Sequence, residues 1–256
     1  MLRQTLSEPH VIKRFIFLCL SSLLAACAQP NANETVTVAV AANFKSALDV
    51  LEADFEDRTN YQLETVVGST GKLYAQIVYG APYDVFLAAD QERPIRLIGE
   101  DRALAGSRFT YALGRLILWG ADDPATLATP EIKRIAIANP NLAPYGKAAE
   151  QVLSQLNLTE STETKIVLGE NVGQAFAFVR TGNAQVGFVS EAQIISLDSG
   201  DTAMSWRPHT DLYDPIAQDA VLLTRSAGNP AAIAFTEYLQ TDAARDIIAQ
   251  HGYDLP

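Results

Sequence analysis

Two polar turns in the first half of this sequence carry residues that could bind a small anion. Ala42 and Asn43 follow one predicted strand, and Ser69 and Thr70 follow the next. The N–H groups that open a helix have no partner within it and attract anions, and two adjacent hydroxyl groups add donors. These turns predict an oxyanion site, although a capped helix that binds nothing would give the same pattern.

The second turn, Gly-Ser-Thr-Gly-Lys-Leu at residues 68–73, differs from the loop that binds nucleotide phosphates. That loop has four residues between its glycines and a Ser or Thr directly after its Lys. Here two residues separate the glycines, and Leu73 follows Lys72. We therefore do not expect a nucleoside triphosphate at this turn.

Two further turns of this kind lie in the second half of the chain. They are Ala-Pro-Tyr-Gly at 143–146, which contains Tyr145, and Gly-Glu-Asn-Val-Gly at 169–173, which contains Val172. Ligands of open α/β sheets bind at the carboxyl ends of strands, where such turns lie. Two turns in each half predict a two-lobed protein that binds a small anion between its lobes.

Enzyme chemistry has less support in the sequence. His209 and His251 lie in neither a serine-hydrolase nor a zinc-protease motif. Asp84, Asp90 and Glu92 are close in sequence, and paired acids can act as general acid and base. We expect Asp84 and Asp90 to have structural roles, and a secreted enzyme that uses these three acids is the alternative from a different class.

The first 26 residues have the pattern of an export signal. Lys13 and Arg14 precede an apolar run at 15–26 that is too short to span a bilayer. The run ends in Leu-Ala-Ala-Cys, which resembles the bacterial lipobox, so we expect lipidation of Cys27. Ordinary signal-peptidase cleavage near Ala26 or Ala28 is the alternative. Residues 27–34 would form a short tether.

Removal of the signal would leave Cys27 as the only cysteine of the mature chain. We therefore expect no disulfide, zinc cluster or catalytic thiol. The 256-residue chain has 30 acidic and 19 basic residues and a net charge of −11, which argues against nucleic acid as a partner. Its length is sufficient for one or two globular domains.

From residue 35 onward, short apolar strands alternate with amphipathic helices, which predicts an α/β fold with largely parallel strands. We expect strand 35–41, a helix capped by Asn43, strand 62–67, helix 72–78, strand 83–88 and helix 91–98 in the first set. The second set is strand 134–138, helix 146–156, strand 164–168, helix 173–180 and strand 185–189. Helices follow from about residue 230.

Two strand-like stretches, 115–119 and 217–223, bracket the second set and are interpreted as crossings between lobes. The predicted division is residues 35–112 plus 224–256 for lobe 1 and 113–223 for lobe 2. Each lobe would be a mostly parallel sheet flanked by helices, with the ligand in the cleft between the lobes.

Six stretches of the sequence resemble the periplasmic molybdate-binding proteins (the ModA family), the solute receptors of molybdate ABC importers. The similarity extends over residues 35–256. It is carried by segments 38–44, 68–71, 80–91, 143–146, 171–174 and 187–189.

The resemblance implies the two-lobed, type II solute-binding fold, which closes over its ligand. It also implies molybdate or tungstate as ligand, held as a bare tetrahedral dianion by hydroxyl, amide and N–H donors without a cation or cofactor. Molybdenum would be bound only as this oxyanion. The family's contact positions correspond here to Ala42, Asn43, Ser69, Thr70, Tyr145 and Val172, the last through its backbone N–H.

One position departs from the family pattern. Many relatives have a tyrosine directly after the Gly-x-Val strand, whereas this chain has Ser190. The shorter hydroxyl group is not expected to reach the anion. We hypothesise that Tyr145, at a turn where those relatives have a small residue, supplies the missing donor.

The resemblance further implies a periplasmic protein that delivers its anion to an ABC permease of the inner membrane. Contact with the membrane itself would occur only through a lipid anchor at Cys27, and we expect a monomer. A receptor for sulfate or phosphate on the same fold is the alternative within this class. Sulfate has the same charge and shape as molybdate, so cavity size must discriminate between them.

Overall fold

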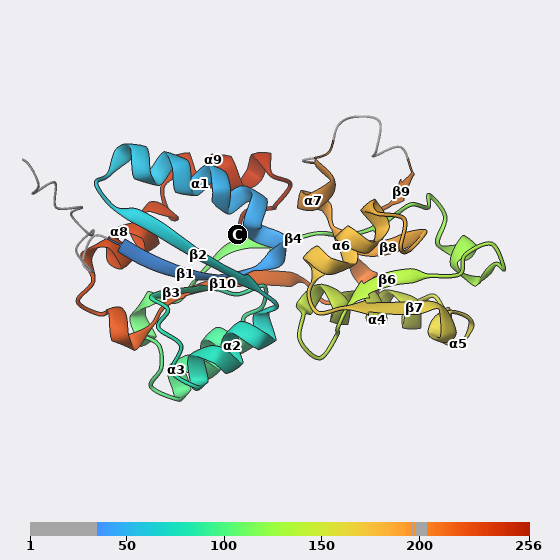
Figure 1. Ribbon diagram of the computed structural model, residues 1–256, viewed down its shortest axis with the longest axis horizontal. Helices are drawn as coiled ribbons and strands as arrows, with labels where there is room; N and C mark the ends of the chain where they lie inside the picture. Colours follow the sequence, from blue (N-terminus) through green and yellow to red (C-terminus); the bar gives the residue numbers. More distant parts are fainter. Residues whose placement is uncertain (1–34, 196, 198–203) are drawn as a thin grey trace, which may run out of the picture. The chain divides into compact units, whose positions relative to one another are not determined.

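Two five-stranded sheets organise the part of the chain described by the computed structural model, which is residues 35–195, 197 and 204–256 (Figure 1). The predicted signal, the tether and Cys27 lie outside the described residues. Within the described ranges, no helix has both the length and the apolar character needed to cross a membrane.

The first sheet has the strand order β2-β1-β3-β10-β4. Strands β1, β2 and β3 are parallel, whereas β10 is antiparallel to both of its neighbours. The bounds are β1 (Thr35–Ala41), β2 (Gln62–Gly68), β3 (Val85–Leu87), β4 (Phe109–Gly114) and β10 (Ile216–Leu222).

Helices cover both faces of the first sheet because its strands alternate apolar side chains between the faces. Val38 and Val40 of β1 pack in one cluster with α1, α8 and α9, while Ala39 packs in another with α2 and α3. Figure 1 shows α1 and α9 on one side of this sheet and α2 and α3 on the other. The predicted apolar face of α1 is confirmed, since Leu48, Phe55 and the residues between them on that face are buried. The helices are α1 (Lys45–Arg58), α2 (Thr70–Val78), α3 (Glu92–Gly99), α8 (Pro230–Tyr238) and α9 (Asp242–Gln250).

The second sheet has the order β7-β6-β8-β5-β9. Strands β6, β7 and β8 are parallel, and β5 is antiparallel to both of its neighbours. The bounds are β5 (Leu116–Trp119), β6 (Ile135–Ala138), β7 (Ile166–Gly169), β8 (Val186–Ser190) and β9 (Ser205–Trp206). The confirmed fold class is therefore α/β with parallel strands at the core of both sheets.

Helix α4 contributes to the main apolar cluster of the second sheet, and α6 contacts β6, β7 and β8. The α-helices of this part are α4 (Pro144–Gln155), α5 (Thr159–Thr162), α6 (Val172–Arg180) and α7 (Glu191–Ile195). Short 3-10 helices are η1 (Ala42–Phe44), η2 (Ala105–Ser107), η3 (Pro124–Ala128), η4 (Glu163–Lys165), η5 (Thr210–Leu212) and η6 (Thr224–Ser226).

The chain passes from the first sheet to the second at Arg115, the one residue between β4 and β5. It returns between β9 and β10. Segment 217–223 is predicted to be a crossing between the lobes and to belong to lobe 2. Its assignment to lobe 2 is corrected here, because β10 pairs with β3 and β4 of the first sheet. A buried apolar run has the same sequence pattern in either sheet, so only its pairing partners show to which sheet it belongs. The rest of the predicted lobe division stays a prediction.

Candidate anion-binding site

The four predicted turns all lie at the carboxyl ends of parallel strands. Helix η1 follows β1 directly, α2 follows β2, α4 follows β6 across residues 139–143, and α6 follows β7. The first N–H groups of each helix have no hydrogen-bond partner within the helix. The helix dipole makes this end of the helix attractive to negative charge. The α/β architecture therefore supplies backbone donors for an anion before any side chain is considered.

Asn43 on the first turn is buried and does not cap a helix. Its Nδ2 donates to Gln218 Oε1 at 2.8 Å and to Tyr253 Oη at 3.2 Å, and Tyr253 Oη donates to the Asn43 carbonyl at 2.7 Å. The predicted capping role is wrong because the segment opens as a 3-10 turn, and neither its N-cap nor that of α1 has a side-chain cap. Tertiary partners hold this carboxamide instead.

Ser69 and Thr70 on the second turn are both buried and both accept a backbone hydrogen bond. Ser69 Oγ accepts from the Lys72 N–H at 3.4 Å as the N-cap of α2, and Thr70 Oγ1 accepts from the Ala89 N–H at 3.1 Å. A hydroxyl group has one proton and two lone pairs, so accepting these bonds does not consume the proton. Each hydroxyl group can therefore still donate to an anion.

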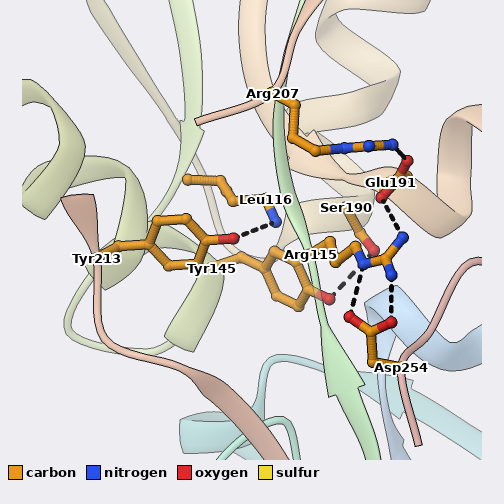
Figure 2. A network of polar contacts seen from close by, with 8 residues as sticks. All are labelled: Arg115, Leu116, Tyr145, Ser190, Glu191, Arg207, Tyr213 and Asp254. Atoms are coloured by element: carbon orange, nitrogen blue, oxygen red, sulfur yellow. Dashed lines mark hydrogen bonds and ion pairs between the residues drawn. The ribbon is translucent and has the colours of Figure 1, made fainter. Parts of the chain in front are cut away.

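Tyr145 on the third turn is 1% exposed, and its Oη accepts from Ser190 Oγ at 3.2 Å (Figure 2). Burial raises the pKa of Tyr145 well above its ordinary value, and the neighbouring side-chain donors of Ser190 and Gln218 oppose this only in part. The phenol is therefore protonated at physiological pH and can act as a donor.

Val172 on the fourth turn is the first residue of α6 and is buried. The preceding residue, Asn171, caps the helix by accepting from the Gln174 N–H at 3.0 Å. The side chain of Asn171 thus satisfies an N–H group of the first turn, and the N–H of Val172 belongs to the groups without a partner inside the helix.

Contacts join turns of the first sheet to turns of the second. A Cβ added at Gly173 would lie 3.5 Å from the Cβ of Ala42, which places the first and fourth turns in contact. The Gly71 N–H donates to the Leu142 carbonyl at 2.8 Å, which joins the second turn to the segment before the third. The exposed Lys72–Glu170 ion pair, at 2.8 Å, joins the second and fourth turns. The structure thus brings together the turns that carry the six predicted contact residues.

Sequence reasoning missed three buried residues beside these turns: Gln218, Tyr111 and Tyr253. Gln218 Oε1 accepts from Asn43 and from Tyr111 Oη, which lies 3.2 Å away. Tyr111 lies at an irregularity in the pairing of β4 with β10, where β4 has one residue more. The available signal was a Gln-Asp pair within the otherwise apolar strand β10.

A polar network surrounds the crossing at Arg115 (Figure 2). Its Nε donates to Asp254 Oδ2 at 2.7 Å, and a second guanidinium nitrogen bonds the other oxygen of the same carboxylate. Arg115 also lies 3.5 Å from the buried Glu191, which pairs with Arg207. This arginine ties the crossing to the C-terminal segment and to the residue that follows Ser190.

The acids considered for catalysis have structural partners. Asp84 accepts from the Thr37 N–H at 2.8 Å and bonds Ser226 and Arg225. Glu92 lies on the outer face of α3, 3.9 Å from Arg96, with a side chain that is 71% exposed.

Asp90 accepts from the Arg93 N–H at 3.0 Å and pairs with the same guanidinium group. Burial raises its pKa and Arg93 opposes this shift. Asp90 also lines a cavity of about 190 Å³ together with Lys147 and Asp214. Across the described ranges, no group of three or more His, Cys, Asp and Glu side chains is arranged to hold a metal ion.

Comparison with known proteins assigns the chain to a family. The bacterial extracellular solute-binding protein family matches residues 36–254. The molybdate-binding protein ModA of Azotobacter vinelandii is 45% identical over 246 residues, which cover 94% of this chain and 97% of that protein. This chain belongs to the ModA family. The resemblance found in the sequence is thereby confirmed.

Other members and solved structures agree. The molybdate-binding protein ModA of Rhodobacter capsulatus is 42% identical, with 91% of this chain and 93% of that protein covered. The structure of the Azotobacter vinelandii periplasmic molybdate-binding protein matches with a TM-score of 0.82 and 39% identity, over 86% of this chain and 99% of that one. The sulfate-binding protein SubI of Mycobacterium tuberculosis, at 15% identity and a TM-score of 0.72, covers 86% of each chain and shares the fold. These matches confirm the two-lobed solute-binding architecture.

Proposed function

We propose that this protein is an extracytoplasmic receptor that captures molybdate or tungstate and delivers it to an ABC importer. The observation that carries the proposal is the convergence of four helix-opening turns with the hydroxyl groups of Ser69 and Thr70 and the neutral phenol of Tyr145. Two relatives of above 40% identity are named molybdate-binding proteins, which supports this choice of anion.

In the proposed site, Ala42, Asn43 and Val172 donate through their opening turns, and the three hydroxyl groups complete the shell. Each hydrogen bond to a charged group contributes roughly 1.5–3 kcal/mol, so several can hold a dianion without a cation or cofactor. The net charge of −11 does not prevent this, because charges more than about 8 Å away are largely screened at physiological salt.

A shell made of donors alone selects a fully deprotonated oxyanion. Hydrogen phosphate carries a proton, and that proton would meet no acceptor in the proposed site. Sulfate differs from molybdate mainly in size, so we infer that the dimensions of the closed site separate these two anions. No catalytic step forms part of this proposal.

Delivery to a permease places the protein outside the cytoplasm. We infer a periplasmic monomer, and a lipid anchor at Cys27 stays a prediction. Mass spectrometry of the N-terminal peptide from the membrane fraction tests the anchor. A diacylated peptide that starts at Cys27 is expected, whereas an unmodified N-terminus near Ala26 or Ala28 contradicts it.

Thermal unfolding of the full chain, expressed with its own leader and dialysed, tests the ligand. Molybdate, tungstate, sulfate and phosphate are compared with buffer alone. A ligand at 100 times its Kd adds about 2.7 kcal/mol of stability, which raises the Tm by several degrees. A rise with molybdate and tungstate alone is expected. A rise only with sulfate or phosphate keeps the receptor class and replaces the ligand, and no rise with any anion contradicts the proposal.

A further inference from the structure

Gln218 lies between a side chain of the first turn and a side chain of the third turn. It belongs to β10 of the first sheet and is fully buried. Its side chain contacts Asn43 of the first turn and faces Tyr145 of the third turn, which belongs to the second sheet. One carboxamide thus lies between a proposed contact residue from each sheet.

The oxygen of this carboxamide is fully used. Oε1 accepts from Asn43 Nδ2 at 2.8 Å and from Tyr111 Oη at 3.2 Å. A carbonyl oxygen has two lone pairs, so these two donors fix which way the planar amide group faces. They also hold Nε2 on the opposite side, toward the second sheet.

The nitrogen of the carboxamide faces the phenol of Tyr145. A Cβ added at Gly114 would lie 2.7 Å from Gln218 Nε2 and 3.0 Å from Tyr145 Cζ, and closer still to the phenolic oxygen. The two groups therefore lie side by side over the bare backbone of Gly114. Among the described residues, buried Nε2 has no hydrogen bond of normal geometry.

An amide donor at this position determines the direction in which the phenolic proton of Tyr145 points. Its oxygen already accepts from Ser190 Oγ at 3.2 Å. With the N–H of Gln218 as a second donor beside it, both lone pairs face donors and the phenolic proton must point elsewhere. A phenol can donate to an anion only when its proton is free to point toward that anion.

We propose that Gln218 is a positioning residue for anion binding, which holds Asn43 through Oε1 and directs the proton of Tyr145 toward the anion through Nε2. The inference rests on the proposed function. In this proposal Gln218 acts through Asn43 and Tyr145 and is not itself a donor to the anion. It acts through Asn43, from the first sheet, and Tyr145, from the second. Both donors are therefore in place only when the two sheets lie close together.

The test measures the Kd for molybdate of Gln218→Met by titration calorimetry. Methionine has a similar length and neither donates nor accepts strong hydrogen bonds, so we expect affinity to fall at least about tenfold. Gln185→Met is the matched control. That side chain accepts from the Lys133 and Arg134 N–H groups and donates to the Glu131 carbonyl at the far end of β8, so its loss should leave Kd unchanged.

Double variants separate positioning from mere stabilisation. If Gln218 acts through Tyr145, the loss in Gln218→Met/Tyr145→Phe is smaller than the product of the two single losses. Thr70 has no contact with Gln218 among the described hydrogen bonds, so Gln218→Met/Thr70→Val should give the full product. Full products in both pairs overturn the inference.

Gly114→Ala provides a second route if Gln218→Met does not fold. The added methyl group would push Nε2 and the phenol apart without altering either residue. Affinity should again fall, and unchanged affinity overturns the inference. A wild-type protein that binds no molybdate overturns the proposed function as well, whereas a wild type and a Gln218→Met variant of equal affinity overturn only this inference.

Discussion

The hydroxyl groups of Ser190 and Tyr145 lie 3.2 Å apart, although 45 residues separate them in the chain. Ser190 ends β8, and Tyr145 reaches it from the opening turn of α4. The phenol of Tyr145 thus lies directly beside the shorter hydroxyl group of Ser190. This arrangement supports the hypothesis that Tyr145 replaces the missing donor.

The phenol of Tyr145 should therefore matter more than the hydroxyl group of Ser190. Tyr145→Phe removes one donor to the anion, and we expect molybdate affinity to fall by about tenfold to a hundredfold. Ser190→Ala removes a hydrogen bond to the phenol but no proposed donor to the anion, so it should cost less than tenfold. Titration calorimetry on both variants measures this order, and an unaltered Kd for Tyr145→Phe would show that the phenol is not needed.

Thr70→Val should weaken both binding and folding. Valine keeps the shape of threonine but removes the proposed donor to the anion and leaves the buried Ala89 N–H without its acceptor. We expect at least about a tenfold loss of affinity and a loss of roughly 1–3 kcal/mol in unfolding free energy.

Thr236→Val is the matched control for Thr70→Val. This threonine is buried in α8, and its hydroxyl group donates to the carbonyl groups of Ala232 and Ile233 in its own helix. Urea unfolding measures the stability of both variants, and titration calorimetry measures their anion affinity. Only Thr236→Val should keep normal affinity. Equal affinities in the two variants would remove Thr70 from the site.

Lys72 and Glu170 should slow the release of the anion. Their ion pair, at 2.8 Å, links the second turn to the fourth, so it is lost when these turns separate. Exposed pairs are worth about 0.2–1 kcal/mol, so Lys72→Met should speed dissociation by up to about fivefold, with less effect at high salt.

Lys45→Met is the control for this pair, since Lys45 bonds Asp49 within α1 and joins no two turns. Stopped-flow measurement of the dissociation rate compares the two variants. Equal rates for Lys72→Met and wild type at low salt would show that the pair does not restrain opening.

Asp84→Asn and Asp90→Asn should change stability and leave anion binding intact. Asp84 accepts from the Thr37 N–H and bonds Arg225 and Ser226, and Asp90 pairs with Arg93. Removing the charge weakens these bonds, with a cost of about 1–3 kcal/mol in unfolding free energy. Loss of molybdate binding in either folded variant would instead support a functional role for the acids.

Stability should fall at alkaline pH. Burial raises the pKa of Tyr111, Tyr145 and Tyr253 above 10, whereas the unfolded chain releases these protons near pH 10. The stabilisation by the neutral phenols is complete below pH 10 and decreases as the pH rises toward the folded-state pKa values, by about 1.4 kcal/mol per pH unit for each phenol. Urea unfolding between pH 8 and 11 measures how the unfolding free energy changes with pH. Tyr145→Phe should reduce this slope by the contribution of one phenol.

The sequence by itself determined the elements that depend on neighbouring residues. The strand pattern of β1 and the apolar face of α1 follow from local spacing, because amphipathicity depends on residues within a few positions of one another. The four turns and the α/β class followed from these.

Only the tertiary structure decided which side chains meet at the turns. Asn43 bonds Gln218 and Tyr253, 175 and 210 residues away, where local pattern predicted a helix cap. Strand β10 pairs with β3 and β4 of the first sheet, although its largely apolar sequence would suit a strand of either sheet. Pairing between strands that are distant in the sequence places Gln218 beside the first turn. Sequence periodicity does not indicate such a contact.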